Sequence, residues 1–339
     1  MKAAVLNKTG KVSDLGKNLK IKEVPTPALQ ENDVLVKVKC ASLNHRDLWI
    51  TKGMYSKIEL PAILGSDCSG IVEDIGSEVK KIKPGDEVII NPSLNWGDSE
   101  EYQSTFYKIL GLPDKGTLAE YIKIDADRIH IKPSYMSFEE ASALPLCGLT
   151  AYRASFIQGQ VKKGDNVLIT GIGGGVATFL LLYCVSVGAN VYVTSSSKDK
   201  IKKAVSLGAV DGVDYTGEDW DRYIRDVTDG EINVVIDSSG SDTINKALEI
   251  CRYGGKIVTY GASLGKVPDF NITRIYWKQI RLIGSTMGSD KDFKDMLAYT
   301  HKKKIVPVVD KIFSLDNVVD AFEHMNSANQ FGKIVVKMP

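Results

Sequence analysis

A glycine cluster between an apolar run and an apolar helix constrains the fold of this chain more than any other feature. The run spans Asn166–Thr170, the cluster Gly171–Gly175, and the predicted helix Gly175 to about Val187. Glycines at such a junction permit a tight turn with positive φ and bring the backbone close to a ligand. Because the first N–H groups of a helix lack partners inside it, they favour a negatively charged group. The segment therefore predicts a dinucleotide-binding turn.

The glycine cluster departs at one position from the pattern GxGxxG that is usual for dinucleotide binding, because Val176 stands last. A glycine-rich connection without a ligand is the alternative interpretation. The residues predicted to bind the cofactor here are Gly171, Gly173, Gly174, Gly175 and Val176.

The residues that follow the next predicted strand, Asn190–Thr194, indicate which dinucleotide is bound. A site for NAD places a carboxylate about 20 residues after the glycines, where it accepts hydrogen bonds from the ribose 2′-hydroxyl. This chain instead has Ser195, Ser196 and, slightly further on, Lys200. Hydroxyls and lysines suit a 2′-phosphate, which brings negative charge and acceptor oxygens. We therefore predict NADP(H); the alternative is that the lysines only form a solvated helix face.

Strands and helices alternate from about residue 163 onward. Beyond the glycine cluster and its neighbours, we expect a helix at Lys198–Leu207, a strand at Val234–Ile236, a helix at Thr243–Cys251 and a strand at Lys256–Tyr260. Two parallel strands need a crossover between them rather than a tight turn. The alternation therefore predicts the α/β class with a doubly wound parallel sheet.

The first third of the chain differs, because it consists of short β-type runs broken by prolines and glycines. The runs are Lys2–Leu6, Asp33–Lys39, Gly70–Ile75, Asp86–Ile90 and Ala119–Ile124. After Gly284 we expect a helix (Lys291–Lys302), a strand (Lys311–Phe313), a helix (Leu315–Met325) and a strand (Gly332–Lys337), which close back on this β domain. The predicted domains are residues 1–127 with 290–339, and residues 128–289.

Charge and apolar patterning exclude several classes of partner. With 43 Lys and Arg against 42 Asp and Glu, the chain has no net field to attract nucleic acid or an anionic membrane. Its longest apolar stretch, Val176–Val187, is shorter than the ~20 residues that a membrane span requires. The first ten residues contain no apolar run, so we expect no secretory signal and a cytoplasmic protein. Five widely spaced cysteines without a CxxC pair predict buried free thiols.

Several ordered blocks together resemble the medium-chain dehydrogenase/reductase superfamily along nearly the whole chain. They are residues 41–47 (ASLNHRD), 64–72 (LGSDCSGIV), 83–88 (KPGDEV), 116–121 (GTLAEY), 143–152 (ALPLCGLTAY), the glycine cluster and 331–335 (FGKIV). The resemblance implies a GroES-like β domain, completed by the C-terminal residues, and a Rossmann domain. It also implies an oxidoreductase.

The resemblance places the catalytic zinc ligands of the superfamily at Asn44, Ser66, Asp67 and Cys147. Only Asp67 and Cys147 are good zinc ligands, since a tetrahedral zinc normally takes imidazole, thiolate or carboxylate. The lobe that holds a second zinc in many members falls within Asn91–Gly116, which contains no cysteine. We therefore predict no metal ligands, and an unorthodox site around Asp67 and Cys147 stays open.

The resemblance also implies residue roles for a metal-free reaction, in which hydrogen bonds polarise the substrate and a side chain supplies the proton. Lys52-Gly53-Met54-Tyr55 is similar to the segment with the active-site tyrosine of zinc-free reductases. The catalytic residues implied are Tyr55, Asn44 and Asp47. Further cofactor contacts implied are Ser285 beside the nicotinamide carboxamide, Tyr215 on the adenosine side and Lys333 at a phosphate.

The sequence thus predicts a zinc-independent, NADPH-dependent oxidoreductase that delivers hydride to a quinone, enone or aldehyde. The alternatives are a zinc-dependent alcohol dehydrogenase and a relative that holds NADPH with little turnover. Its expected partners are a small-molecule carbonyl, enone or quinone substrate and further copies of itself. The apolar segment Asn271–Ser285 suggests an edge strand that forms a homodimer or homotetramer.

Overall fold

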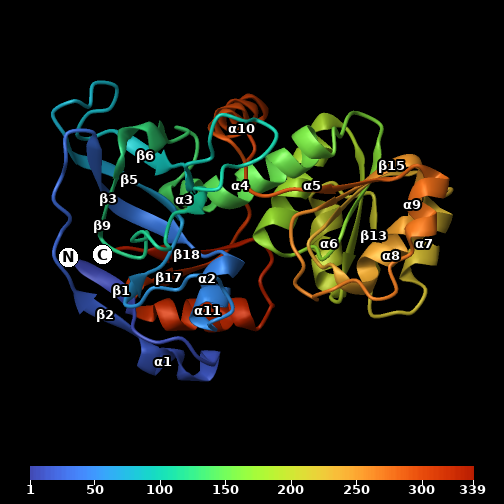
Figure 1. Ribbon diagram of the computed structural model, residues 1–339, viewed down its shortest axis with the longest axis horizontal. Helices are drawn as coiled ribbons and strands as arrows, with labels where there is room; N and C mark the ends of the chain where they lie inside the picture. Colours follow the sequence, from blue (N-terminus) through green and yellow to red (C-terminus); the bar gives the residue numbers. More distant parts are fainter. The chain divides into compact units, whose positions relative to one another are not determined.

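The computed structural model describes residues 1–339, and the chain divides into two compact units (Figure 1). Unit 1 comprises Met1–Cys147 and Gly288–Pro339, and unit 2 comprises Gly148–Met287. The domain boundary expected after residue 127 lies within unit 1. There β10 (Ile129–Ile131) pairs with β6 (Glu87–Ile90), and the helix α3 (Phe138–Ala143) contacts four strands of the same sheet.

Unit 1 is built on a seven-stranded sheet in the order β10-β6-β5-β3-β18-β17, with β9 also paired to β3. A three-stranded sheet, β2-β1-β4, and the pair β7-β8 complete it. The remaining strands are β1 (Lys2–Leu6), β2 (Leu19–Glu23), β3 (Asp33–Ser42), β4 (Ala62–Ile63), β5 (Asp67–Ile75), β7 (Ser93–Leu94), β8 (Lys108–Ile109), β9 (Tyr121–Asp125), β17 (Val309–Ser314) and β18 (Lys333–Lys337).

The C-terminal tail completes this sheet, as the sequence predicted. Its last strand, β18, pairs antiparallel with β3, so that Val335 lies opposite Ser42, and the red and blue strands are adjacent in Figure 1. The helices of unit 1 are α1 (Leu15–Asn18), α2 (His45–Thr51), α3, α10 (Asp290–Lys303) and α11 (Val318–Asn326). Buried residues of β3, β5 and β18 share one hydrophobic core with Leu48 of α2 and Phe322 of α11. The start of β18 is therefore held inside the unit.

Unit 2 contains one six-stranded sheet in the order β13-β12-β11-β14-β15-β16, and every pairing in it is parallel. The strands are β11 (Asn166–Ile169), β12 (Asn190–Ser195), β13 (Asp211–Asp214), β14 (Ile232–Asp237), β15 (Cys251–Thr259) and β16 (Arg281–Gly284). The helices between them are α5 (Gly175–Val187), α6 (Lys198–Ser206), α7 (Trp220–Val227), α8 (Ser241–Ile250) and α9 (Ile272–Lys278). The predicted α/β class and parallel sheet are confirmed.

The chain passes from unit 1 to unit 2 within α4 (Pro145–Tyr152), which continues as a π-helical turn, Arg153–Gln158. Short 3-10 turns lie at Val12–Asp14, Ala126–Arg128 and Leu315–Asn317. All five cysteines are free and buried, as expected. No helix has both the length and the apolar character that crossing a bilayer requires.

The expected edge strand at Asn271–Ser285 is only partly a strand. Residues Ile272–Lys278 form the helix α9, and only Arg281–Gly284 join the sheet as its edge strand β16. The helix ends at Gln279, whose φ of 53° turns the chain into the strand. The apolar residues of this segment therefore belong to a helix and to an edge strand. A short apolar run does not indicate where one ends and the other begins.

Candidate active site

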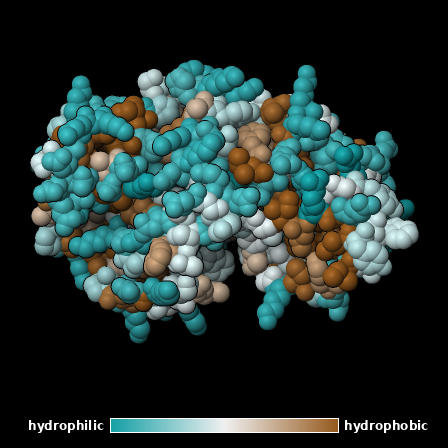
Figure 2. All heavy atoms as spheres, turned by 45° about the horizontal axis from the view of Figure 1, so that its top comes forward, coloured by the Kyte–Doolittle hydropathy of each residue, from teal (hydrophilic) through white to brown (hydrophobic).

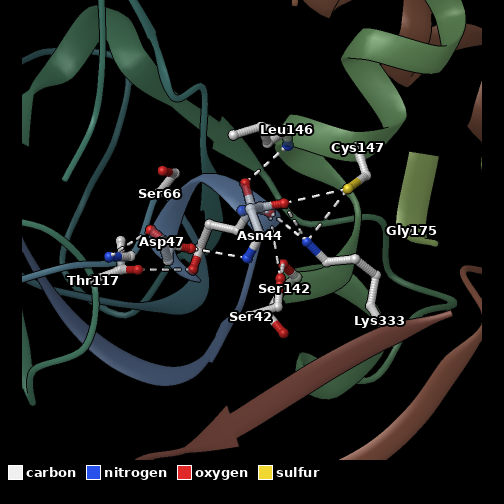
Figure 3. A network of polar contacts seen from close by, with 12 residues as sticks. Ser42, Asn44, Asp47, Ser66, Thr117, Ser142, Leu146, Cys147, Gly175 and Lys333 are labelled. Atoms are coloured by element: carbon white, nitrogen blue, oxygen red, sulfur yellow. Dashed lines mark hydrogen bonds and ion pairs between the residues drawn. The ribbon is translucent and has the colours of Figure 1, made fainter. Parts of the chain in front are cut away.

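A cluster of polar side chains lies inside unit 1 around the ammonium group of Lys333 (Figure 3). Its Nζ donates to Asn44 Oδ1 at 2.7 Å, to Asp67 Oδ2 at 3.0 Å and to Cys147 Sγ at 3.5 Å. Asn44 Nδ2 in turn donates to Asp67 Oδ2 at 2.9 Å, and the Cys147 thiol donates to Asn44 Oδ1 at 3.3 Å. All four side chains are buried, so the cluster is a closed network around a cation.

Four different elements bring these side chains together. Asn44 precedes the first residue of α2, Asp67 begins β5, Lys333 begins β18, and Cys147 lies in the first turn of α4. Asp67 also accepts from the backbone N–H of Leu146 at 2.8 Å through its Oδ1 atom. The carboxylate therefore ties the start of α4 to the ammonium.

Asp47 lies beside this cluster, and its carboxylate accepts hydrogen bonds from backbone N–H groups. Its Oδ2 accepts from the Asn44 N–H at 2.8 Å, which forms a capping box at the start of α2, and its Oδ1 accepts from the Gly65 N–H at 3.3 Å. The side chain is fully buried, and this burial raises the pKa of Asp47, while the nearby Arg46 opposes the shift. The geometry makes Asp47 a residue that positions Asn44.

The charged groups around Lys333 keep its amino group protonated. Burial alone lowers the pKa of Lys333, but the negative charges of Asp67 and of Cys147 in its thiolate form outweigh it and raise the pKa above the ordinary value. Burial raises the pKa of the Cys147 thiol to about 11, so the thiol is protonated at pH 7. The cluster therefore contains an ammonium, a carboxylate and a neutral thiol.

Arg46 connects two other residues that the sequence singled out. Its Nη1 donates to the Leu110 carbonyl at 2.8 Å and to Ser66 Oγ at 2.7 Å, and Ser66 Oγ donates to the same carbonyl at 2.7 Å. The guanidinium carbon lies 5.2 Å from the ring centroid of Tyr55, a cation–π distance. Arg46 Nε is buried without a hydrogen-bond partner. Tyr55 is half-buried against the core, so its ring is held while part of it stays accessible.

The glycine cluster of unit 2 joins β11 to α5 as predicted. Gly171 and Gly173 have φ values of 65° and 129°, which favour glycine, and α5 begins at Gly175 with Val176 in its first turn. A Cβ atom added to Gly174 would meet no atom within 4 Å, so open space lies beside the loop. Because all six strands are parallel, their carboxyl ends share one edge, and β11 and β14 form the point at which the strand order reverses.

The residues predicted to select the dinucleotide meet at this edge. Thr194 Oγ1 accepts from the Gly171 N–H at 3.1 Å, which joins the glycine loop to the end of β12. Ser195 is buried at the end of β12, and Ser196 is exposed. The backbone carbonyl of Ser195 accepts from the backbone N–H of Tyr215 at 3.1 Å. Lys200 lies in the first turn of α6, where its N–H donates to the Ser197 cap at 3.4 Å. Two serines at the end of β12, a lysine in the first turn of α6 and an exposed tyrosine after β13 thus lie along the carboxyl edge of the sheet.

Known proteins match both units. Residues 30–134 match the alcohol dehydrogenase GroES-like domain, and residues 175–302 match the zinc-binding dehydrogenase family. A zinc-type alcohol dehydrogenase-like protein of Schizosaccharomyces pombe is 37% identical over 93% of each chain. An acryloyl-coenzyme A reductase of Sulfurisphaera tokodaii is 30% identical over 94% of this chain and 96% of its own.

A solved structure of an NAD-dependent alcohol dehydrogenase covers 100% of both chains with a TM-score of 0.94 and 33% identity. The chain belongs to the medium-chain dehydrogenase/reductase superfamily. The predicted resemblance, the GroES-like unit and the Rossmann unit are confirmed. This member of the superfamily is an oxidoreductase that uses a nicotinamide cofactor.

The superfamily also implies a zinc ion, and the residues of this member do not fit one. At two positions that the resemblance assigns to zinc ligands, this chain has the amide of Asn44 and the hydroxyl of Ser66, and the Ser66 hydroxyl is hydrogen-bonded to Arg46 and to a carbonyl. The Lys333 ammonium is 3.0 Å from the Asp67 carboxylate, where it repels a second cation. No group of three His, Cys, Asp or Glu side chains among residues 1–339 is arranged to hold a metal.

A nicotinamide dinucleotide, in contrast, fits the residues of unit 2. The helix α5 presents the unpaired N–H groups of its first turn beside the open space at Gly174. Ser285 directly follows β16, and its hydroxyl oxygen is buried without a partner in the chain. A buried hydroxyl without a partner is uncommon and is explained where a ligand supplies the hydrogen bond.

The structure corrects the role that the sequence analysis gave to Lys333. The residue was expected at a cofactor phosphate, but it is buried and its three N–H groups point to Asn44, Asp67 and Cys147. Arg46 had no predicted role, although it lies within the motif from Asn44 to Asp47. The available signal was an arginine placed between Asn44 and Asp47 in that motif.

Proposed function

We propose that this oxidoreductase is a zinc-independent, NADPH-dependent reductase that delivers hydride to a quinone, an enone or an aldehyde. The observation that carries the proposal is the cluster in unit 1, where a lysine ammonium lies among the side chains at the metal-ligand positions. The identity to an acryloyl-coenzyme A reductase supports reduction of a conjugated carbonyl.

NADPH, when bound, supplies the hydride, and the side chains of the chain handle the charge and the proton. Negative charge develops on the substrate oxygen during hydride addition, so a hydrogen-bond donor there lowers the barrier. Tyr55 is the proposed donor, because Arg46 fixes its ring and its side chain is only half-buried. Asn44 and Asp47 act as positioning residues, because their side chains cap α2 and anchor the cluster.

The proposed preference for NADPH rests on Ser195, Ser196 and Lys200 at the end of β12. Charge-assisted contacts to a 2′-phosphate contribute ~1.5 to 3 kcal/mol each, so NADPH should bind at least about tenfold more tightly than NADH. The variant Ser196→Asp should narrow or reverse this ratio, because a carboxylate repels the phosphate. Ser206→Asp adds the same charge to an exposed site at the end of α6 and should leave the ratio unchanged. Fluorescence titration with both cofactors measures it, and equal affinities in the parent protein contradict the preference.

The reductase activity is tested with purified protein, NADPH and a panel of quinones, enones and aldehydes. Steady NADPH oxidation with at least one substrate is expected. Activity should survive dialysis against a strong chelator, and elemental analysis should find far less than stoichiometric zinc. Activity that is lost on chelation and restored by zinc favours the alcohol dehydrogenase alternative. NADPH binding without turnover across the panel favours the binding role.

We also propose that the chain forms a homodimer through the edge of the unit 2 sheet. The edge strand β16 leaves its outer backbone groups unpaired, and Leu282 on it is 42% exposed. Tyr276 and Trp277 of the adjacent helix α9 are each 65% exposed. Hydrophobic side chains also lie open on the face of unit 2 seen in Figure 2. Exposed apolar groups at a free strand edge favour pairing with a second copy.

A further inference from the structure

The side chains around Lys333 are arranged as they would be around a bound cation. An amide oxygen, a carboxylate oxygen and a sulfur atom, from three different elements, all point at one position (Figure 3). The Lys333 ammonium fills that position with one N–H for each atom. The orientation of the Asn44 amide follows, because an ammonium only donates and must therefore face the oxygen.

The backbone at Lys333 fixes the ammonium in this place. Gly332 has a φ of 114°, and a Cβ atom there would lie 2.3 Å from the Val308 carbonyl oxygen, so only glycine fits. The Lys333 N–H donates to the same carbonyl at 2.8 Å, and its side chain is 2% exposed. A lysine that starts β18 in this way has a buried stem and cannot turn its charge out to solvent without unfolding the strand end.

We infer that the Lys333 ammonium is a resident cation that takes the place of a metal ion, orients Asn44 and keeps divalent cations out of the cluster. The single positive charge of Lys333 balances the single negative charge of Asp67, which it contacts at 3.0 Å. A divalent ion bound to the same carboxylate would lie close to the ammonium and be strongly repelled by it. With the ammonium removed, the sulfur and carboxylate oxygen would suit a borderline-soft divalent ion such as Zn²⁺ or Co²⁺. The inference rests on the metal-free part of the proposed function.

A matched pair of variants tests the exclusion of metal. Asn44→Cys keeps Lys333 and adds a third ligand beside Asp67 and Cys147, while Asn44→Cys/Lys333→Ala has the same ligands without the ammonium. Both are titrated with Co²⁺, whose thiolate complexes absorb in the near ultraviolet. We expect stoichiometric binding with this band only in the double variant, and a weaker band when Cys147→Ser is added. Equal binding by the pair, or no binding by either, overturns the inference.

A charge-balance cycle covers the case in which the alanine variant does not fold. Lys333→Met preserves most of the side-chain volume and leaves the Asp67 carboxylate without its cation, so thermal denaturation should occur at a clearly lower temperature. Adding Asp67→Asn removes that charge and should restore at least half of the loss. A Lys333→Met protein as stable as the parent, or no recovery in the double variant, also overturns the inference. None of these measurements uses turnover, so a failed reductase assay leaves them interpretable.

Discussion

The Tyr55 ring packs against its neighbours while part of the side chain stays accessible. A single substitution can therefore test whether its hydroxyl takes part in the reaction. The Arg46 guanidinium lies 5.2 Å from the ring centroid, so Tyr55→Phe keeps the cation–π contact and removes only the hydroxyl. If that hydroxyl supplies the proton, kcat should fall by ~10²- to 10⁴-fold while the affinity for NADPH stays nearly constant.

The matched control for this substitution is Tyr121→Phe, which removes a hydroxyl from a half-buried tyrosine of β9 in the same unit. Steady-state kinetics on the best substrate of the panel should leave this control close to the parent protein. A Tyr55→Phe enzyme within about twofold of the parent would instead assign proton donation to ordered water or to the cofactor ribose.

The residues of the cluster differ in how far the sequence could place them. Asn44, Asp67 and Cys147 lie in motifs that the resemblance identifies, so they were expected together. The position of Lys333 depends on the pairing of β18 with β3, and the residue is 289 positions from Asn44. The residues next to Lys333 in the sequence carry no information about such a distant contact. They therefore could not show whether its side chain is buried in a cluster or exposed at the end of a strand.

At the scale of elements, the contact between β10 and α10 makes the stability of unit 1 sensitive to pH. The His130 ring of β10 lies 4.7 Å from the Phe293 ring of α10, measured between centroids. Burial lowers the pKa of His130 from 6.5 to about 4, with Arg128 and Lys294 adding to the shift and Asp290 opposing it. Between these two values the unfolded chain binds more protons, so the free energy of unfolding rises with pH.

The stability that His130 contributes is therefore complete above pH 6.5 and is lost as the pH falls toward 4. The variant His130→Gln does not titrate, so its melting temperature should fall less than that of the parent across this range. His301→Gln, which changes an exposed histidine of α10, should follow the parent. Thermal denaturation at a series of pH values measures the three curves, and parallel curves for the parent and His130→Gln contradict the prediction.

Elements with a strong local signal were predicted well, and those fixed by context were not. The apolar helix after the glycines was expected from Gly175 to Val187 and spans those residues, because its cap and its apolar run agree. The helix α2 was not predicted, although Asn44 and Asp47 form its capping box, because its seven residues are too few for a periodic pattern. The strand predicted where α9 lies was wrong for the same reason, since a stretch of seven residues such as ITRIYWK suits either structure.

At the scale of the whole molecule, both units depend on pairings between distant parts of the chain. In unit 1 the sheet is complete only when β18 has joined β3. In unit 2 the sheet is open at both edges, and β16 at one edge has exposed apolar neighbours. The apolar content of this segment indicated a site of self-association. The number of subunits, however, depends on how whole molecules pack around a symmetry axis, which a short segment does not specify.

The dimer proposed for this edge is tested by a charge placed on it. Leu282→Glu puts a carboxylate on β16. In a two-fold interface the substitution occurs in both subunits, so two carboxylates are buried against an apolar surface and can also repel each other. We expect the parent protein to sediment as a dimer and Leu282→Glu as a folded monomer with an unchanged circular dichroism spectrum. Phe106→Glu is the control, because Phe106 is 80% exposed and belongs to unit 1, so it is not part of the unit 2 sheet. A Leu282→Glu protein that remains dimeric, or a parent that is monomeric at micromolar concentration, shows that β16 does not form the interface.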